Sequence, residues 1–87
     1  MYVVLVYDFG EKRVNKMLKL CRKYLNWVQN SVFEGEISDA RLKELLMLSD
    51  VFMKKEEDSI IVFRGPSQAS MDKLIIGKER SSVDVFL

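Results

Sequence analysis

The amino-acid sequence predicts an α+β sandwich in which two helices cover one face of a small antiparallel sheet. Short apolar runs alternate with longer amphipathic segments along the 87 residues, in the order strand, helix, strand, strand, helix, strand. Right-handed crossovers turn this order into a ferredoxin-like βαββαβ sandwich. We expect one domain over residues 1–87, because a chain of this length can bury only one core.

The first predicted strand is the apolar run at residues 1–7 (MYVVLVY), which Asp8 follows. A run without polar positions is typical of a strand that is buried on both faces. A carboxylate beside such a strand is costly to bury unless it is paired or binds a cation. The end of a central strand is also a common place for chemistry in α/β proteins. Asp8 is therefore the candidate catalytic and metal-binding residue.

Residues 11–25 predict an amphipathic helix whose apolar face includes Met17 and Cys21. Arg13, in the first turn, is directed toward the strand end that carries Asp8. The opposite face is basic and contains no acidic residue; its members are Lys12, Lys16, Lys19, Arg22 and Lys23. Two interpretations remain open: a solvated helix face, or a surface that contacts phosphates.

Residues 27–37 (WVQNSVFEGEI) predict two short strands with a bend near Asn30 and Ser31. Gly35 is a candidate bulge. Ser38 is a good N-cap for a helix that runs to about residue 52. The core-facing positions expected for that helix include Ala40, Leu45, Leu48 and Val51.

The C-terminal third predicts up to three further strands. Residues 59–63 (SIIVF) form a second strand that is apolar on both faces, closed by Arg64 and Gly65. Residues 71–76 are a candidate strand. Residues 83–87 (VDVFL) alternate like an additional edge strand.

Two helices leave one sheet face uncovered, yet the first strand is apolar on both. Leaving either Tyr2, Val4 and Val6 or, on the other face, Val3, Leu5 and Tyr7 in water would forgo roughly 1.5–3 kcal/mol per side chain. We therefore expect a homodimer packed through its sheet faces, with residues 83–87 pairing to the partner's sheet edge. Asp8 shares a face with Tyr2, Val4 and Val6 by alternation. If that face is turned to the partner, the two Asp8 carboxylates converge and could bind one Mg²⁺.

The composition limits the catalytic and metal-binding groups that the chain can supply. The chain has no histidine and one cysteine, which excludes Ser-His and Cys-His nucleophiles and thiolate metal clusters. Carboxylates with a hard cation such as Mg²⁺ remain. The single thiol, the absence of a basic leader segment and the short apolar run together predict a cytoplasmic protein without a membrane span.

Several motifs together resemble one known family. They are Tyr7-Asp8, the basic helix beginning at Lys12, residues 28–34 (VQNSVFE) and the strand at residues 60–64. The chain resembles the small CRISPR-associated Cas-two proteins over almost its whole length, and V-Q-x-S-V-F-E is the most specific motif.

The resemblance implies a ferredoxin-like homodimer whose two Asp8 carboxylates flank a magnesium ion. It also implies metal-dependent endonuclease activity on single-stranded RNA or double-stranded DNA. It implies a part in spacer acquisition, where the dimer bridges integrase subunits and lies along DNA. By position, Tyr7, Arg13, Ser31 and Phe33 match further functional residues of the family.

One position departs from the family pattern. Many members carry an arginine directly before the Val-Gln pair, and Trp27 stands there in this sequence. A phosphate contact would be lost at that position, although an aromatic ring can stack or pack.

Two hypotheses follow. In the first, Asp8 of both subunits holds Mg²⁺ for phosphodiester cleavage, Arg13 steadies the phosphate, and Ser31 offers a hydroxyl nearby. In the second, the protein is a non-catalytic module that binds nucleic acid and bridges proteins. The residues expected to contact the nucleic-acid backbone are Arg13, Lys16, Lys19 and Arg22.

Simpler interpretations of two residues stay open beside these hypotheses, and a third function is disfavoured. Ser31 also fits a bend and Phe33 a core position. An acylphosphatase-like enzyme on the same fold is disfavoured, because no glycine-containing phosphate loop precedes a suitable arginine.

Overall fold

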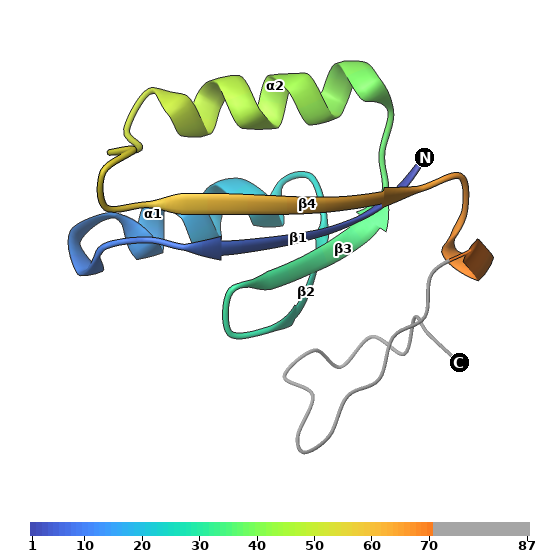
Figure 1. The fold of residues 1–87 in the computed structure, drawn as a ribbon, viewed down its shortest axis with the longest axis horizontal. Coiled ribbons are helices and arrows are strands. Elements are labelled where there is room, and N and C mark those ends of the chain that lie inside the picture. Colours follow the sequence, from blue (N-terminus) through green and yellow to red (C-terminus); the bar gives the residue numbers. More distant parts are fainter. Residues whose placement is uncertain (71–87) are drawn as a thin grey trace.

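A computed structural model describes residues 1–70 of the chain. Its elements follow the predicted order (Figure 1). They are β1 (Tyr2–Asp8), α1 (Glu11–Arg22), β2 (Asn26–Gln29), β3 (Val32–Glu36), α2 (Asp39–Asp50), β4 (Ser59–Gly65) and a short 3₁₀ turn (Gln68–Ser70). The candidate strands at residues 71–76 and 83–87 lie outside the described residues.

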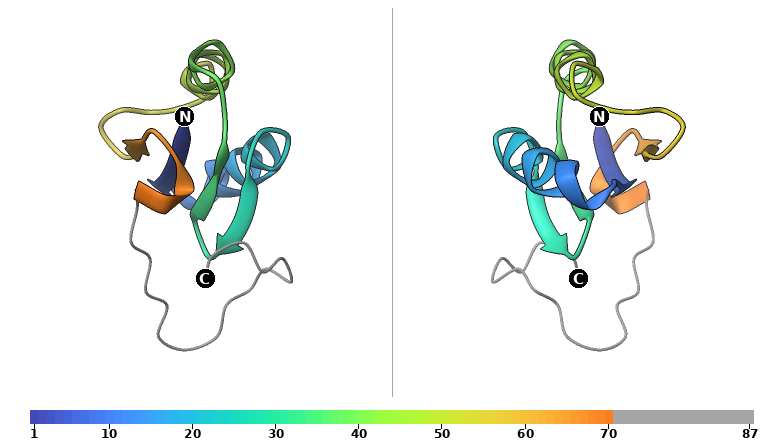
Figure 2. Two further views of the ribbon diagram at one scale, coloured as in Figure 1. Left: turned by 90° about the vertical axis from the view of Figure 1, so that its right-hand side faces the viewer. Right: turned by 90° about the vertical axis from the view of Figure 1, so that its left-hand side faces the viewer.

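Within residues 1–70, the sheet has four strands in the order β2-β3-β1-β4, and all neighbouring pairs are antiparallel. Both helices lie on the same side of this sheet (Figure 2). The order and the one-sided helices confirm the predicted ferredoxin-like sandwich.

β1 lies between β3 and β4, and its two faces differ. Val3 and Leu5 are fully buried beneath the helices. Val4 and Val6, on the opposite face, are only half-buried. On β4 the residues in register with them, Phe63 and Ile61, are 54% and 53% exposed. We call the face that carries these four side chains the open face.

The turn between β2 and β3 confirms the predicted bend. Asn30 has a φ of 44°, in the left-handed region that asparagine tolerates better than most residues. The bulge, however, is not at Gly35, which pairs regularly with Val3. It lies on β2 between Trp27 and Gln29, because an edge strand accommodates an extra residue more easily than a strand paired on both sides.

α2 begins where it was predicted to begin but buries a different face. The Ser38 hydroxyl caps the helix by accepting the Arg41 N–H at 3.1 Å. The expected core positions Ala40, Leu48 and Val51 are exposed, and the buried ones are Leu42, Leu45 and Ser49. Apolar residues occur all round this helix, so their spacing alone does not fix the buried side.

The buried Ser49 hydroxyl donates to the Leu46 carbonyl at 2.7 Å, which satisfies it within the helix. On α1, the predicted apolar face is confirmed, since Met17 and Cys21 are fully buried. No helix within residues 1–70 is long and apolar enough to cross a membrane.

Candidate functional site

Asp8 is the last residue of β1 and is in register with Ser59, the first residue of β4. Its side chain is exposed. The residues on either side, Tyr7 and Phe9, are both buried in the core. The Asp8 carboxylate therefore lies at the end of the sheet, between two residues whose aromatic side chains are buried. We call these two residues, Tyr7 and Phe9, the aromatic anchors.

The aromatic anchors pack against each other and against β3. The Tyr7 and Phe9 ring centroids are 5.6 Å apart in an edge-on arrangement, and Tyr7 stacks on Phe33 at 6.2 Å. The Tyr7 N–H donates to the Ser31 carbonyl at 3.1 Å. Burial raises the pKa of Tyr7, and the Ser31 side chain opposes part of that rise.

The structure thus brings the three predicted supporting residues together around Tyr7, which directly precedes Asp8 in β1. Phe33 is fully buried and Tyr7 nearly so, which favours the simpler interpretation of Phe33 as a core residue. Ser31 is half-buried at the β2–β3 turn. Their contacts connect the end of β1 to the β2–β3 turn and to β3.

Arg13 is bound to carboxylates. Its Nε donates to Asp58 Oδ2 at 2.6 Å and its Nη2 to Asp58 Oδ1 at 2.9 Å. Nη2 also reaches Glu57 Oε1 at 3.1 Å. The Arg13 side chain is 11% exposed. This geometry favours an internal role for Arg13 over the phosphate contact expected from the sequence.

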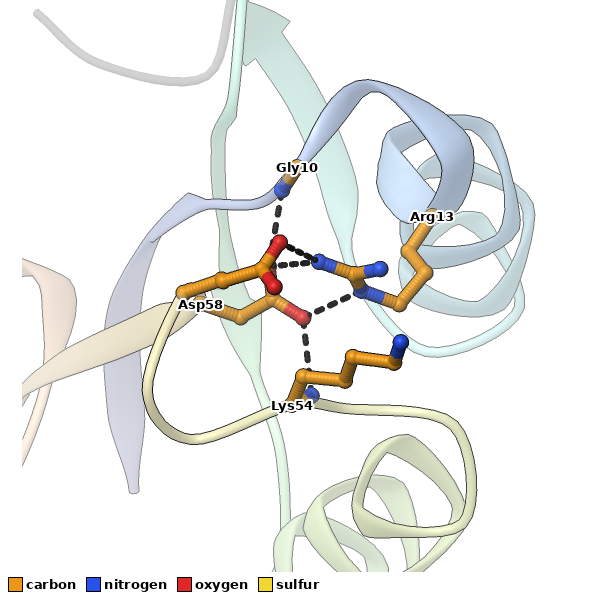
Figure 3. A network of polar contacts seen from close by, with 5 residues as sticks. Gly10, Arg13, Lys54 and Asp58 are labelled. Carbon is orange, nitrogen blue, oxygen red and sulfur yellow. Dashed lines mark hydrogen bonds and ion pairs between the residues drawn. The ribbon is translucent and has the colours of Figure 1, made fainter.

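Asp58 is the residue that the sequence analysis missed (Figure 3). Its side chain is fully buried, and it also accepts the main-chain N–H groups of Gly10 at 2.7 Å and Lys54 at 2.9 Å. These hydrogen bonds, first those from Arg13, hold the pKa of Asp58 far below its ordinary value, against the effect of burial. In the sequence, Asp58 ends a charged run (KKEED) that resembles a solvated turn, so nothing there distinguishes it.

The basic face of α1 is exposed as predicted, at Lys12, Lys16, Lys19, Arg22 and Lys23. Two of its cations lie over aromatic rings of neighbouring elements. Lys16 Nζ is 5.9 Å from the centre of the Phe52 ring, and the Arg22 guanidinium is 5.0 Å from Trp27. Trp27 stands where many family members have an arginine. The guanidinium of Arg22, which lies over the Trp27 ring, therefore keeps a cation next to this position.

Asp8 fits one part of a magnesium site. Within residues 1–70, no group of three or more histidine, cysteine or acidic side chains could enclose a metal ion. Magnesium is usually held by one or two carboxylates and several waters. An exposed carboxylate such as Asp8 suits the role of one of these ligands.

Comparison with known proteins places the chain in a family. Residues 1–72 match the family model described as CRISPR associated protein Cas2. A Dictyoglomus turgidum protein named CRISPR-associated endoribonuclease Cas2 is 39% identical over 87 residues, covering 100% of both chains. A Thermotoga maritima protein of the same name is 44% identical over 80 residues, 92% of each chain.

A solved structure described as "Crystal structure of cas2" superposes with a TM-score of 0.85 at 42% identity, covering 100% of this chain and 98% of the other. The sequence motifs, the sheet order and these similarities agree. The chain belongs to the Cas2 family of CRISPR-associated proteins.

Proposed function

We propose that this protein is a metal-dependent endoribonuclease that works as a homodimer in the CRISPR system. The observation that carries the proposal is the exposed Asp8 carboxylate at the end of a central strand. The names of the relatives from Dictyoglomus turgidum and Thermotoga maritima, which call them endoribonucleases, support the same activity.

The open face supports the homodimer. Ile61 and Phe63 are about half exposed there, beside the half-buried Val4 and Val6. Asp8 lies on the same face by strand alternation. A second copy packed face to face would cover the apolar side chains and bring the two Asp8 carboxylates toward each other across a two-fold axis.

Different residues of the chain would bind the metal, support the strand end and contact the nucleic acid. The two Asp8 carboxylates would hold Mg²⁺, which when bound supplies a Lewis acid and an activated water for attack on the phosphodiester. Tyr7 and Phe9, both buried, keep the strand end rigid. The exposed lysines and Arg22 on α1 would neutralise the backbone of the nucleic acid.

A second function is favoured by the basic face of α1. Five exposed cations with no acid among them fit a duplex DNA backbone. We propose that this face lets the dimer lie along DNA while it bridges integrase subunits during spacer acquisition. That role needs no chemistry from Asp8, so both functions can reside in one molecule.

The test of the nuclease is Asp8→Asn, assayed on single-stranded RNA with Mg²⁺ and with EDTA. We expect cleavage by the wild type only with the metal, and a loss of at least ~100-fold in the variant. Asp39→Asn, which changes another exposed aspartate at the start of α2, is the matched control and should cleave normally.

The same variant separates the two functions. Asp8→Asn should bind duplex DNA as tightly as the wild type, because the α1 face is untouched. RNA cleavage that survives in Asp8→Asn would refute the catalytic role of Asp8 and leave the scaffold role as the better proposal.

A further inference from the structure

We propose that Asp58 is a positioning residue for Asp8. Together with Gly10 and Arg13, it holds the segment that follows β1 against the segment that precedes β4, next to the Asp8–Ser59 pair at the end of the two strands. We call this arrangement the clamp. This inference rests on the nuclease proposed above. It concerns how the chain aims the Asp8 carboxylate, and it assigns a task to a buried ion pair that the proposed chemistry does not use.

The clamp has a complete set of hydrogen bonds (Figure 3). Asp58 Oδ1 accepts the Gly10 N–H at 2.7 Å and Arg13 Nη2–H at 2.9 Å. Asp58 Oδ2 accepts Arg13 Nε–H at 2.6 Å and the Lys54 N–H at 2.9 Å. Each oxygen thus accepts one main-chain and one guanidinium donor, which fills the capacity of a carboxylate.

The position of the clamp links it to Asp8. Gly10 follows Asp8 by two residues, and Asp58 directly precedes Ser59, the residue in register with Asp8. One carboxylate therefore ties the segment leaving β1 to the segment entering β4. Phe9 also packs edge-on against Phe52, in the same segment between α2 and β4, at 6.1 Å. Two contacts therefore hold the residues after Asp8 against this segment.

Gly10 is part of the clamp because a side chain there would collide with the guanidinium of Arg13 in its present position. A Cβ built at Gly10 would lie 2.5 Å from Arg13 Nη2 and 3.3 Å from its Cζ. Both atoms belong to the far end of a flexible side chain, so Gly10→Ala can fold with the guanidinium displaced. This variant opens the clamp and leaves every charge in place.

A buried ion pair also stabilises a fold without serving any site, and this second interpretation makes a different prediction. A purely structural clamp affects only the fraction of folded molecules. A positioning clamp changes the turnover of molecules that are fully folded, because misplacement of a reacting group by about 1 Å can cost ~100-fold in rate.

The experiment compares wild type, Gly10→Ala, Asp58→Asn, Arg13→Lys and Arg13→Ala at a temperature where circular dichroism shows all of them folded. Turnover number and KM are measured on single-stranded RNA with Mg²⁺. Independently of activity, NMR follows hydrogen exchange of the Gly10 amide and the carboxyl ¹³C shift of Asp8. Arg41→Ala is the control, because it removes an exposed ion pair, Arg41–Glu44 at 3.0 Å, on α2.

We expect kcat to fall ~10- to 100-fold in Gly10→Ala and Asp58→Asn while KM changes less than about 2-fold. The Gly10 amide should exchange faster and the Asp8 carboxyl shift should move. Arg13→Lys keeps the positive charge but loses the paired hydrogen bonds of the guanidinium to the two oxygens of Asp58. It should therefore retain more activity than Arg13→Ala. Arg41→Ala should match the wild type in every measurement.

An unchanged kcat in folded Gly10→Ala, together with faster exchange of the Gly10 amide, would overturn the inference, since the clamp would be open and Asp8 still effective. If Asp58→Asn does not fold, Gly10→Ala decides. A wild type that cleaves no RNA refutes the proposed nuclease instead. The Asp8 carboxyl shift then decides the positioning: an unchanged shift in Gly10→Ala overturns it.

Discussion

Two aspartates of this chain show how far burial determines the role of a side chain. Asp8 is exposed at the end of β1, available to a cation. Asp58, which lies one residue before the strand partner of Asp8, is fully buried and accepts hydrogen bonds on both oxygens. In the sequence both are acidic residues at a strand boundary. The burial of Asp58 and its hydrogen bonds from Arg13, Gly10 and Lys54 distinguish it from the exposed Asp8.

The lowered pKa of Asp58 predicts how the fold responds to acid. Because this carboxyl has a pKa below its ordinary value of 3.8 in the folded state, the unfolded chain takes up the proton first as the pH falls. The stabilisation is therefore complete above about pH 4–5 and is lost progressively below that range.

Thermal melts from pH 6 to pH 2 check this expectation. The melting temperature of the wild type should fall steeply below pH 4, and that of Asp58→Asn should start lower and fall less steeply. Parallel curves for the two proteins would show that Asp58 does not titrate differently in the folded state.

Cys21 gives a second prediction at this scale. Burial raises the pKa of its thiol to about 12 from an ordinary value of 9.0, and it is the single cysteine of the chain. At pH 8 a disulfide reagent such as DTNB should react on the order of 1000-fold more slowly with the folded protein than with the chain in guanidinium chloride, from the thiolate fraction alone. Rapid labelling of the folded protein would contradict the buried placement.

At the scale of elements, α1 separates two tasks on its two faces. Its buried side packs Met17 and Cys21 into the core, and its exposed side presents the five cations. Both faces could be predicted, because apolar and basic residues follow the helical period with little mixing. α2 could not be oriented in this way: apolar residues surround it, and which of them are buried depends on packing against the sheet.

The basic face predicts a salt-dependent interaction with DNA. Replacing Lys16, Lys19 and Arg22 with glutamine removes three charges from it. The slope of log K against log salt for duplex DNA should fall by about 2 to 3, because each phosphate contact contributes about 0.9. The measurement is a binding titration at several salt concentrations.

A matched triple variant controls for net charge. Arg41, Lys43 and Lys55 are exposed on α2 and in the loop after it, and changing them to glutamine should leave the slope unaltered. Equal slopes for both triple variants would remove the basic face from the DNA interface.

At the scale of the whole molecule, the open face is the unusual feature. Phe63 is 54% exposed on β4, next to β1 on the open face, and the proposed homodimer would cover it. Phe63→Asp should place like charges near each other across the two-fold axis and weaken the dimer at least ~100-fold. Sedimentation equilibrium at micromolar concentration measures this change.

Val51→Asp is the control, because Val51 is 82% exposed directly after α2, on the other side of the sheet. Its dimer should remain intact. A wild type that is monomeric at micromolar concentration, or a Val51→Asp variant that dissociates as readily as Phe63→Asp, would contradict the proposed interface.

The sequence predicts the sandwich and the location of Asp8, because apolar runs and their order are local properties of the chain. It does not predict the partner of Arg13. That pairing joins α1 to the loop before β4 across more than forty residues, and a charged run such as KKEED has the composition of an exposed turn. Likewise the stacking of Arg22 on Trp27 depends on how α1 lies beside β2.

The short distance between Gly10 and the Arg13 side chain predicts which positions should change together during evolution. A side chain at position 10 would occupy the place of the guanidinium, and the loss of the guanidinium would leave the carboxylate at position 58 buried without its main counter-charge. Among descendants of this chain, positions 10, 13 and 58 should therefore change together or not at all. A lineage that acquires a bulkier residue at position 10 should also have replaced both members of the ion pair.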